Sequence, residues 1–350
     1  MKFMNRDLRN FGRAYVIAEL GANHNGDMDL ARKLIDAAKR AGADCVKFQS
    51  WTKDTIFSKG VYESNHFLKD DYRSRNDFTL EQIVEKFQIT EAQLLEMRDY
   101  CTKVGIDFSS TPFCERETDF LVDKLGAGFI KVASMDCNNY PFLDHLARKG
   151  LPVMLSTGLS TLAEVAEAVD TIERAGNRDI ILLHCVAVYP PADEIVHLNN
   201  IDLLRDNFPE YPVGFSDHTL GTIIPLGALG KGACVIEKHF TLDKSMFGWD
   251  HKVSATEDEM AIICEAARRI PTALGSYRRV LSAADHEKIP AFRRSIVAAR
   301  PVKAGTVLTR ADLDLKRPGT GLAPKWMPLV IGRTAKRDLA YDQILGPEDF

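Results

Sequence analysis

Short apolar runs alternate with amphipathic segments from residue 15 to residue 274. The eight apolar runs are YVIAEL, DCVKFQ, IDFSST, FIKVAS, PVMLST, IILLHC, PVGFS and ACVIEKHF. Helical periodicity is found between them at Leu30–Ala41, Glu91–Val104, Thr161–Ala175 and Thr256–Leu274. Helix ends are indicated by Gly42, Gly105, Gly126, Gly150 and Gly176. Eight strand-and-helix units over about 260 residues are typical of a (β/α)8 barrel rather than an open sheet.

Two stretches differ from this repeating pattern. A long polar and aromatic insertion, residues 50–90, follows the second apolar run, and we expect it to form a lid over the barrel mouth. After Gly275 the repeat ends, and a charged segment interrupted by Pro290 is typical of a linker. The sequence therefore predicts a barrel domain at 1–276, a linker at 277–293 and a small domain of short strands at 294–350.

Composition and charge limit the possible partners. At 350 residues and 45% apolar content, the chain can bury a barrel core and still carry a small second domain. A net charge of −4 and an isoelectric point near 6.2 argue against nucleic acid or an anionic membrane as a partner, and no apolar run could span a bilayer. The first residues lack the apolar stretch of a secretion signal, and the seven cysteines contain no CxxC pair. These features predict a cytoplasmic protein with reduced, buried thiols.

The carboxyl ends of the predicted strands are unusually polar. In a barrel of parallel strands these ends meet at one mouth, where the active site lies. In strand order, the polar residues there are Glu19; Lys47 and Gln49; Ser109, Ser110 and Thr111; Lys131 and Ser134; Ser156 and Thr157; His184; Ser216, Asp217 and His218; and Glu237 and His239. Because side chains alternate along a strand, Lys47 and Gln49 share one face, and so do Glu237 and His239.

Two lysines, Lys47 and Lys131, are expected to point into the barrel. Charges buried without partners are costly, so ion pairs with neighbouring acids are one explanation. The same lysines close to Ser134, Ser156 and Ser216 would also suit an anionic ligand such as a phosphate, held by charge and by hydroxyl donors. The collective pattern favours the anion site.

Two histidines, His218 and His239, end neighbouring predicted strands. If these strands are adjacent, the two side chains lie about 5 Å apart. A single histidine here would more often belong to the core, but two, each close to an acid, favour a shared divalent ion. Two nitrogen ligands leave open positions for water or substrate oxygen, which favours Mn²⁺ or Mg²⁺ over a structural zinc. His184 fits either strand packing or a phosphate-facing role.

Three polar turns complete the set of candidates. The turn NHNGD follows Glu19 and is expected to face the substrate. In FGWDH, Asp250 would lie over the site, where a carboxylate could bind sugar hydroxyls. The turn KRPGTG carries Arg317, whose target the sequence leaves open.

Ten motifs in chain order cover nearly the whole sequence. They are IAELGANHNGD, VKFQ, SSTPF, KVAS, LSTG, LLHC followed by YP, FSDHTLG, IEKHFTLD, RRSIVA and KRPGTG. Together they resemble the sialic acid synthase family, whose members make nonulosonic acids. The resemblance implies a TIM barrel followed by an antifreeze-like (SAF) domain, and a domain-swapped homodimer in which that domain caps the partner's barrel.

The resemblance also implies an activity of the N-acetylneuraminate synthase type. Such a transferase condenses phosphoenolpyruvate with an open-chain N-acyl amino sugar, such as N-acetylmannosamine, and releases phosphate by C–O cleavage. The implied catalytic residues are Glu19, Asp136 and Glu237, and the implied ligands of Mn²⁺ or Mg²⁺ are His218 and His239. Phosphoenolpyruvate is implied to contact Lys47, Thr111, Lys131, Ser134, Ser156 and Ser216. The sugar is implied to contact Gln49, Tyr189, Asp250 and, from the other subunit, Arg317.

Two departures from the family pattern bear on the acceptor sugar. Met135 and Asp136 stand where the family usually has Gly-Glu, and Ala187 stands where Asn or Ser is frequent. Both lie near the expected sugar and phosphate pocket, so synthesis of legionaminic or pseudaminic acid from 6-deoxy diacetamido sugars is an alternative. A barrel aldolase that acts through a Schiff-base lysine is another. A C-terminal module that binds ice or carbohydrate is disfavoured by the charges of that segment.

Overall fold

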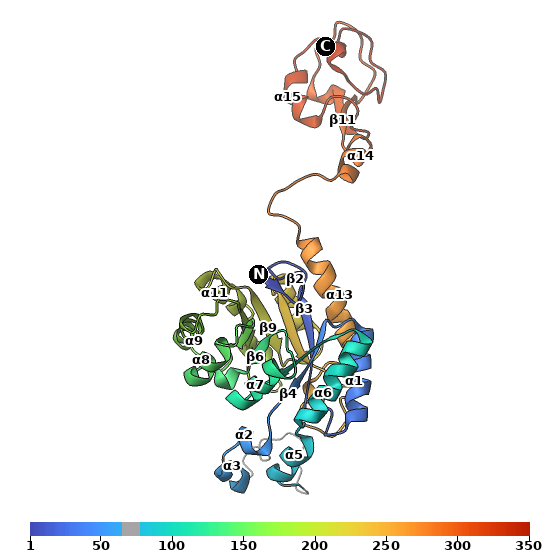
Figure 1. The fold of residues 1–350 in the computed structure, drawn as a ribbon. Helices are drawn as coiled ribbons and strands as arrows, with labels where there is room; N and C mark the ends of the chain where they lie inside the picture. Colours follow the sequence, from blue (N-terminus) through green and yellow to red (C-terminus); the bar gives the residue numbers. More distant parts are fainter. Residues whose placement is uncertain (65–77) are drawn as a thin grey trace. The chain divides into compact units, whose positions relative to one another are not determined.

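Eight parallel strands lie in the N-terminal part of the protein (Figure 1), and their pairing makes a closed ring. The computed structural model describes residues 1–64 and 78–350. The strands of the ring are β3 (Tyr15–Gly21), β4 (Cys45–Gln49), β5 (Asp107–Thr111), β6 (Ile130–Val132), β7 (Val153–Ser156), β8 (Ile180–Cys185), β9 (Val213–Asp217) and β10 (Val235–His239). Their order is β5-β4-β3-β10-β9-β8-β7-β6, and contact between β5 and β6 closes the barrel. Every apolar run identified in the sequence overlaps one of these strands, and only β3 and β9 extend one residue beyond their runs.

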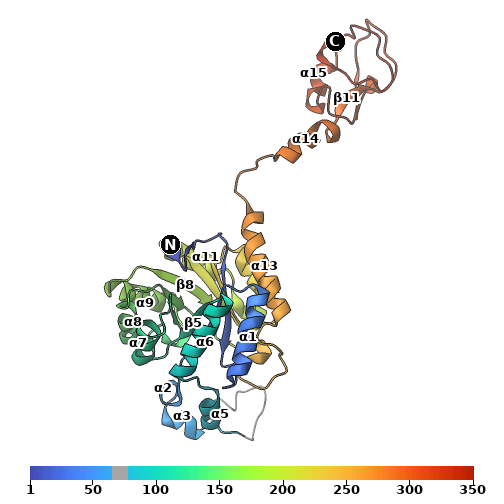
Figure 2. The same cartoon turned by 45° about the vertical axis from the view of Figure 1, so that its right-hand side comes forward.

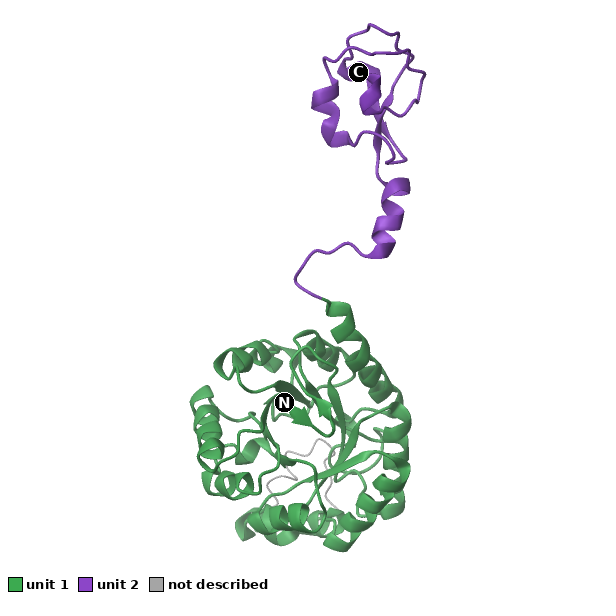
Figure 3. Ribbon diagram, turned by 45° about the horizontal axis from the view of Figure 1, so that its top comes forward, with its two compact units in different colours: residues 1–275 green, residues 276–350 purple. Residues whose placement is uncertain are grey.

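Helices surround the barrel (Figure 3). They are α1 (Met28–Ala41), α6 (Glu91–Val104), α7 (Glu115–Asp123), α8 (Tyr140–Ala147), α9 (Leu162–Arg174), α10 (Asp193–Val196), α11 (Asn200–Asn207), α12 (Ile223–Gly230) and α13 (Glu257–Leu274). The four predicted helices begin and end within two residues of the observed bounds. Local signals explain the agreement: α6 begins at a capping box of Thr90 and Gln93, and it ends at Gly105, whose φ is 72°. Helices α1 and α6 lie side by side outside the barrel (Figure 2).

The two faces of each barrel strand carry different side chains. Outward side chains such as Val46, Phe215 and Ile236 pack against the helices and form the main apolar core. Inward side chains near the amino ends of the strands, such as Tyr15 and Phe129, form a second core inside that half of the barrel. The inward face therefore changes from apolar to polar towards the carboxyl ends of the strands.

A hairpin of β1 (Lys2–Phe3) and β2 (Arg6–Asp7) closes the barrel at the end where its strands begin. The ring centroid of Phe3 lies 5.1 Å from that of Tyr15 and 5.3 Å from that of Phe129, and Leu8 belongs to the same core. In Figure 1 the N-terminus lies at the end of the barrel opposite the insertion that follows β4. Apolar side chains thus fill the barrel between the amino ends of its strands and the polar mouth at their carboxyl ends.

The predicted lid insertion lies at this mouth (Figure 1). Its described helices are α2 (Lys53–Ile56), α3 (Lys59–Ser64) and α5 (Leu80–Phe87), and residues 65–77 of the predicted lid are outside the described residues. Ring contacts join the insertion to the loop after β10, with centroid distances of 5.4 Å between Trp51 and Trp249 and 6.2 Å between Phe87 and Trp249. The insertion packs at the mouth as expected, and its opening and closing stay a prediction.

Residues 276–350 form a separate compact unit (Figure 3). Its elements are α14 (Ala283–Phe292), β11 (Ser295–Ala298), β12 (Leu313–Lys316) and α15 (Met327–Val330). Its small core includes Ile296, Leu313 and Leu345. The sequence does not predict α14, because Pro290 suggests an interruption, whereas the structure places this proline in the last turn of the helix.

Two further expectations concern the whole chain. None of the helices described here is long and apolar enough to cross a membrane. All seven cysteines are free, and all except Cys114 are buried. The expectation of unpaired, mostly buried thiols is confirmed.

Candidate active site

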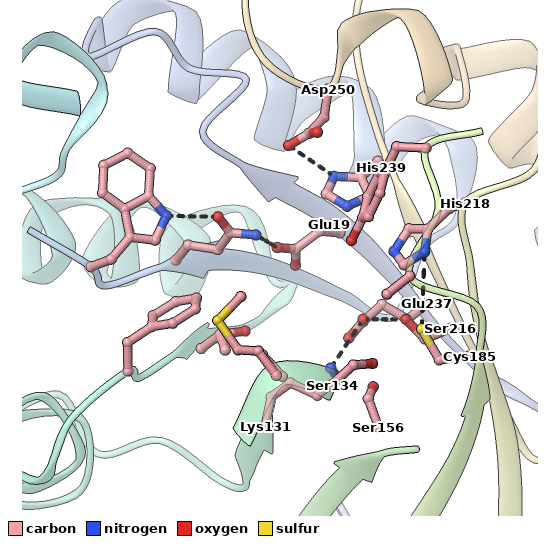
Figure 4. Close-up of a pocket in the computed structure, with 18 of the residues that line it drawn as sticks. Glu19, Lys131, Ser134, Ser156, Cys185, Ser216, His218, Glu237, His239 and Asp250 are labelled. Carbon is pink, nitrogen blue, oxygen red and sulfur yellow. Dashed lines mark hydrogen bonds and ion pairs between the residues drawn. The ribbon is translucent and has the colours of Figure 1, made fainter. Parts of the chain in front are cut away.

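A cavity of about 610 Å³ opens at the carboxyl ends of the barrel strands (Figure 4). Thirteen of the fifteen predicted site residues line it. They are Glu19, Lys47, Gln49, Thr111, Lys131, Ser134, Ser156, Tyr189, Ser216, His218, Glu237, His239 and Asp250. The exceptions are Asp136 and Arg317.

Strand register brings these side chains to similar heights in the barrel. Glu19 is paired with Lys47 on one neighbouring strand and with His239 on the other. Glu237 is paired with Ser216 in the same way. Because alternate residues of a strand point to the same side, a polar position and the one two residues later both face the cavity.

Two lysines and two glutamates form a buried charge network in the cavity. Lys47 Nζ lies 2.5 Å from Glu19 Oε2 and 3.7 Å from Glu237 Oε2, and it donates to Thr111 Oγ1 at 2.6 Å. Lys131 Nζ lies 3.4 Å from Glu237 Oε1. The ion pairs considered from the sequence are therefore present. They do not exclude an anion site, because Lys131 makes one long hydrogen bond and a loose ion pair and keeps donor capacity for a ligand.

The pKa values of the two carboxyl groups shift in opposite directions. Burial raises the pKa of Glu19 to about 7, and the nearby Lys47 offsets this effect only in part. Burial also acts to raise the pKa of Glu237, but Lys131 and Lys47 outweigh it and lower that pKa to about 2. Glu237 is thus a lasting counter-charge for the lysines, whereas Glu19 can exchange a proton near neutral pH.

Serine hydroxyls line the cavity together with Lys131 (Figure 4). Ser156 Oγ is buried and has no hydrogen-bond partner among the described residues. Ser134 lies directly against Gly158, where an added Cβ would be 2.6 Å from Ser134 Oγ. Ser216 differs, because it donates to a Glu237 oxygen at 2.9 Å. A phosphate oxygen would satisfy the unpaired hydroxyl of Ser156.

The two histidines lie side by side at the edge of the charge network (Figure 4). Their ring centroids are 5.5 Å apart, which confirms the predicted proximity. His218 Nδ1 donates to the carbonyl oxygen of Val186 at 2.8 Å, so Nε2 is the ring nitrogen that remains for a cation. His239 Nδ1 is buried without a hydrogen-bond partner within the described part of the chain, and Asp250 Oδ2 lies 3.7 Å from it.

These rings fit a divalent cation. Burial and the neighbouring His218 hold the pKa of His239 well below its usual value, so its imidazole is neutral, which is the form that binds metal. Burial acts to lower the pKa of His218, but Cys185 outweighs burial and raises it, so a proton competes with a cation for His218. In the described ranges, no group of three or more His, Cys, Asp or Glu side chains could hold a metal ion. A cation on the two rings would keep positions for water and substrate.

Aromatic side chains lie around the outer part of the cavity. The ring of Tyr189 lies 3.9 Å from that of His218, measured between centroids. Trp51 Nε1 donates to Gln49 Oε1 at 2.8 Å, and Gln49 Nε2 donates to Glu19 Oε1 at 3.1 Å. The Gln49 amide is therefore held in one orientation between an indole and a carboxylate.

Asp136 does not line the cavity, contrary to its predicted catalytic role. It is the last residue of a 3-10 turn, η1 (Ser134–Asp136), in which successive side chains point about 120° apart. Ser134 and Met135 face the cavity as a result, and Asp136 does not. Its carboxylate accepts a hydrogen bond from Asn139 Nδ2 at 3.0 Å, and burial raises its pKa.

Two other candidates lie outside the central cavity. Arg317 belongs to the C-terminal unit, where its guanidinium lies 5.1 Å from the ring centroid of Phe292, and its contact with a sugar stays a prediction. His184 points out of the barrel, where Nε2 is 2.7 Å from the carbonyl oxygen of Val196 and the ring lies 5.6 Å from that of Phe215. It lines a smaller cavity of about 290 Å³, so strand packing is the role that its surroundings support.

Several cavity residues are absent from the predicted set. They include Trp51, Phe113, Leu159, Cys185 and Trp249. Alternation along β8 would have identified Cys185, because its neighbour His184 points outward. The aromatic residues carry no such signal, since an apolar side chain at a rim and one in a core look alike in a sequence.

The fold and the site together define a (β/α)8 barrel enzyme whose cavity holds a buried network of two lysines and two glutamates and has two histidines at its edge; a separate C-terminal unit follows. Comparison with known proteins narrows this class. Residues 34–279 match the NeuB family and residues 293–350 match the SAF domain, so the chain belongs to the NeuB family. The resemblance found in the sequence is confirmed, including its SAF domain.

Individual relatives agree with this assignment. The chain is 38% identical over 330 residues to the N,N'-diacetyllegionaminic acid synthase of Legionella pneumophila, which covers 93% of this chain and 91% of the relative. It is 32% identical to the N-acetylneuraminate-9-phosphate synthase of Drosophila melanogaster, with 95% of each chain covered. A crystal structure of the N-acetylneuraminic acid synthetase of Leptospira borgpetersenii is similar, with a TM-score of 0.72, 31% identity, and 83% and 94% of the two chains covered.

Proposed function

We propose that the protein joins phosphoenolpyruvate to the open-chain form of an N-acyl amino sugar, with release of phosphate. One observation carries the proposal: a single cavity combines two lysines and the unpaired Ser156 hydroxyl with two histidine rings 5.5 Å apart. The first group suits a phosphate and a carboxylate, and the second suits a cation that faces an aldehyde oxygen. The product is a nonulosonic acid, in agreement with the names of the relatives.

Phosphoenolpyruvate lies in the inner part of the cavity in this proposal. The two lysines of the charge network provide positive charge, and Ser134 and Ser156 provide hydroxyl donors. Thr111 and Ser216 already bond to Lys47 and to a glutamate of the network, so their main role is to orient those charged groups.

His218 and His239 hold Mn²⁺ or Mg²⁺ in this proposal, and the bound ion supplies Lewis-acid polarisation of the sugar aldehyde. Asp250 lines the same cavity, with its carboxylate 3.7 Å from a ring nitrogen of His239, and it binds a hydroxyl group of the sugar. Gln49 and Tyr189 line the outer cavity and offer an amide and a phenol to the sugar hydroxyls.

The bond changes follow from the substrates. The methylene carbon of phosphoenolpyruvate bonds to the aldehyde carbon, and the aldehyde oxygen becomes a hydroxyl group. Water adds to the central carbon, and phosphate leaves with the oxygen that joined it to that carbon. Glu19 exchanges the protons, because a pKa of about 7 gives it both states near neutral pH. Glu237 stays ionised and stabilises positive charge on the central carbon.

We propose a diacetamido trideoxyhexose as the acceptor rather than N-acetylmannosamine. The Legionella relative, at 38% identity, is a N,N'-diacetyllegionaminic acid synthase. The cavity is also lined by Trp51, Phe113, Leu159 and Trp249, whose apolar surfaces suit a methyl group and a second acetamido group better than hydroxyl groups.

The proposed assembly is a homodimer in the cytoplasm. Arg317 is exposed, so it is available to reach the N-acyl group of a sugar bound in a partner's barrel. The free thiols of all seven cysteines suit a reducing compartment.

A phosphate-release assay tests the function. The acceptors are N-acetylmannosamine, its 6-phosphate and the diacetamido precursors of legionaminic and pseudaminic acid, each with phosphoenolpyruvate and Mn²⁺ or Mg²⁺. We expect release to need both substrates, to be fastest with a diacetamido sugar, and to stop on chelation and in His239→Ala. Trapping of pyruvate on a lysine by borohydride, together with full activity after chelation, would contradict the proposal and support an aldolase.

A further inference from the structure

We propose that the buried ion pair of Asp217 and Lys238 is a positioning device for the two histidines. Asp217 directly precedes His218, and Lys238 directly precedes His239. Neither side chain lines the cavity, because alternation turns both to the outer side of the barrel. The inference rests on the proposed function, since it assumes that the histidines hold a divalent ion.

The pair is completely withdrawn from water. Both side chains have an exposed fraction of 0%, and Lys238 Nζ lies 2.6 Å from Asp217 Oδ2. Burial of two charges costs so much free energy that a well-packed apolar pair is often as stable or more stable. Stability alone therefore gives no reason for charges at this position, whereas a geometric role does.

The pair stands at the end of the ladder between β9 and β10. Lys238 and Asp217 are direct partners in that ladder, and β9 ends at Asp217. His218 and Thr219 therefore follow the last residue of the strand. Their backbone groups need partners from elsewhere, because they are buried.

The ion pair provides those partners for Thr219. Asp217 Oδ1 accepts the backbone N–H of Thr219 at 2.8 Å, and Lys238 Nζ donates to the carbonyl oxygen of Thr219 at 2.6 Å. Both backbone groups of the residue after His218 are thus bonded to the pair. Because Lys238 belongs to β10, these bonds connect the backbone around His218 to the strand that carries His239.

Other contacts near the two histidines do not make this connection. The His218 ring is bonded to the carbonyl of Val186, which follows β8. Beyond His239, the N–H of Phe240 bonds to the carbonyl of Glu19 at 2.8 Å. The Asp217–Lys238 pair therefore sets the separation of the two backbone segments that carry the rings.

Metal binding to full-length variants tests this role. The double variant Asp217→Leu/Lys238→Met removes both charges and both bonds to the backbone of Thr219 but keeps the apolar volume of the pair, and circular dichroism checks that it folds. We expect it to bind Mn²⁺, titrated by electron paramagnetic resonance, about tenfold more weakly than the wild type or weaker still. Its affinity for phosphoenolpyruvate without metal should be unchanged. Lys244→Met, which breaks the half-buried ion pair with Glu259, is the matched control and should bind Mn²⁺ normally.

The outcomes separate the possible failures. Wild-type Mn²⁺ affinity in the double variant would overturn the inference. If that variant does not fold, Asp217→Asn replaces it, because asparagine keeps an oxygen for Thr219 but not the charge for Lys238; weaker Mn²⁺ binding then supports the role, and unchanged binding overturns it. If His239→Ala binds Mn²⁺ as tightly as the wild type, the two histidines do not form the metal site. The metal-binding part of the proposed function is then wrong, whatever the role of Asp217 and Lys238.

Discussion

Lys47 Nζ lies 2.5 Å from Glu19 Oε2 across the neighbouring strands β4 and β3, with side-chain exposed fractions of 2% and 3%. Each group is therefore the main counter-charge of the other. Lys47→Met should lower the free energy of unfolding by up to about 3–5 kcal/mol, because Glu19 loses its main counter-charge and must stay ionised without a partner or take up a proton. Adding Glu19→Gln should restore part of the stability but no phosphate release. Urea unfolding of the single and double variants measures this, and strictly additive losses would contradict the coupling.

Lys131 provides the second test of the anion site. Lys131→Ala should weaken the binding of phosphoenolpyruvate by about tenfold to a hundredfold, the effect of losing a charge-assisted hydrogen bond of about 1.5–3 kcal/mol. Calorimetric titration with phosphoenolpyruvate measures the change. Lys149→Ala is the control, because Lys149 makes ion pairs on the outside of the barrel with Asp119 and Asp123. Equal affinity in both variants would count against the phosphate position.

The Trp51 indole offers a test of the sugar side. Trp51→Phe keeps an aromatic ring beside Trp249 but removes the N–H that orients Gln49. Loss of a hydrogen bond worth about 1 kcal/mol should raise the KM for the amino sugar about fivefold and leave the KM for phosphoenolpyruvate unchanged. Trp326→Phe, in the C-terminal unit, is the matched control. An equal rise in both KM values would show that Trp51 does not act through the sugar site.

The buried carboxyl group of Glu117 should make the stability of the protein depend on pH. Its carboxylate accepts hydrogen bonds at 2.7 Å from Thr55 Oγ1 in α2 and from the N–H of Phe113, and burial raises its pKa above 4.5. Because the pKa of Glu117 is higher in the folded than in the unfolded protein, its protonated form stabilises the fold below pH 4.5. This stabilisation is lost as the pH rises through the pKa of the folded protein. Glu117→Gln lacks this titration. Its free energy of unfolding should therefore improve relative to the wild type between pH 4.5 and pH 8, and a constant difference would refute the assignment.

The proposed dimer can be tested by complementation. Arg317→Ala should raise the KM for the sugar, and His239→Ala should be inactive. The two variants are mixed in equal amounts under conditions that allow subunits to exchange, so that half of the dimers contain one subunit of each kind. If Arg317 serves the partner's barrel, one of the two sites in each mixed dimer is intact. About a quarter of the wild-type sites should then be recovered. No recovery above the Arg317→Ala activity, despite exchange of subunits, would place Arg317 in its own chain's site or in none.

Strand positions were predictable because their signals are local. In VIEKH, alternation alone places Glu237 and His239 on one face and Lys238 on the other, and the observed contacts agree. Helix ends were predictable for the same reason, since a capping box and a left-handed glycine need only a few residues of context.

The remaining features depend on information that a single segment lacks. Asp136 was expected at the site because the resemblance implies a carboxylate near this position, but the 3-10 turn presents Ser134 and Met135 to the cavity instead. The pairing of Asp217 with Lys238 requires the register between two strands, which loop lengths and neighbouring helices determine. Trp51 belongs to the site only because the insertion packs at the mouth.

In the part of the chain that the structure describes, Phe3 and Leu8 close the barrel at the amino ends of its strands, so ligands enter and leave at the mouth. Lys131 is 4% exposed, whereas Tyr189 near the rim is 43% exposed. Phosphoenolpyruvate bound at Lys131 must therefore arrive before the amino sugar, which covers it in the outer part of the cavity. Steady-state kinetics should be of the compulsory-order type, with phosphoenolpyruvate first, and inorganic phosphate should leave last and inhibit competitively against it.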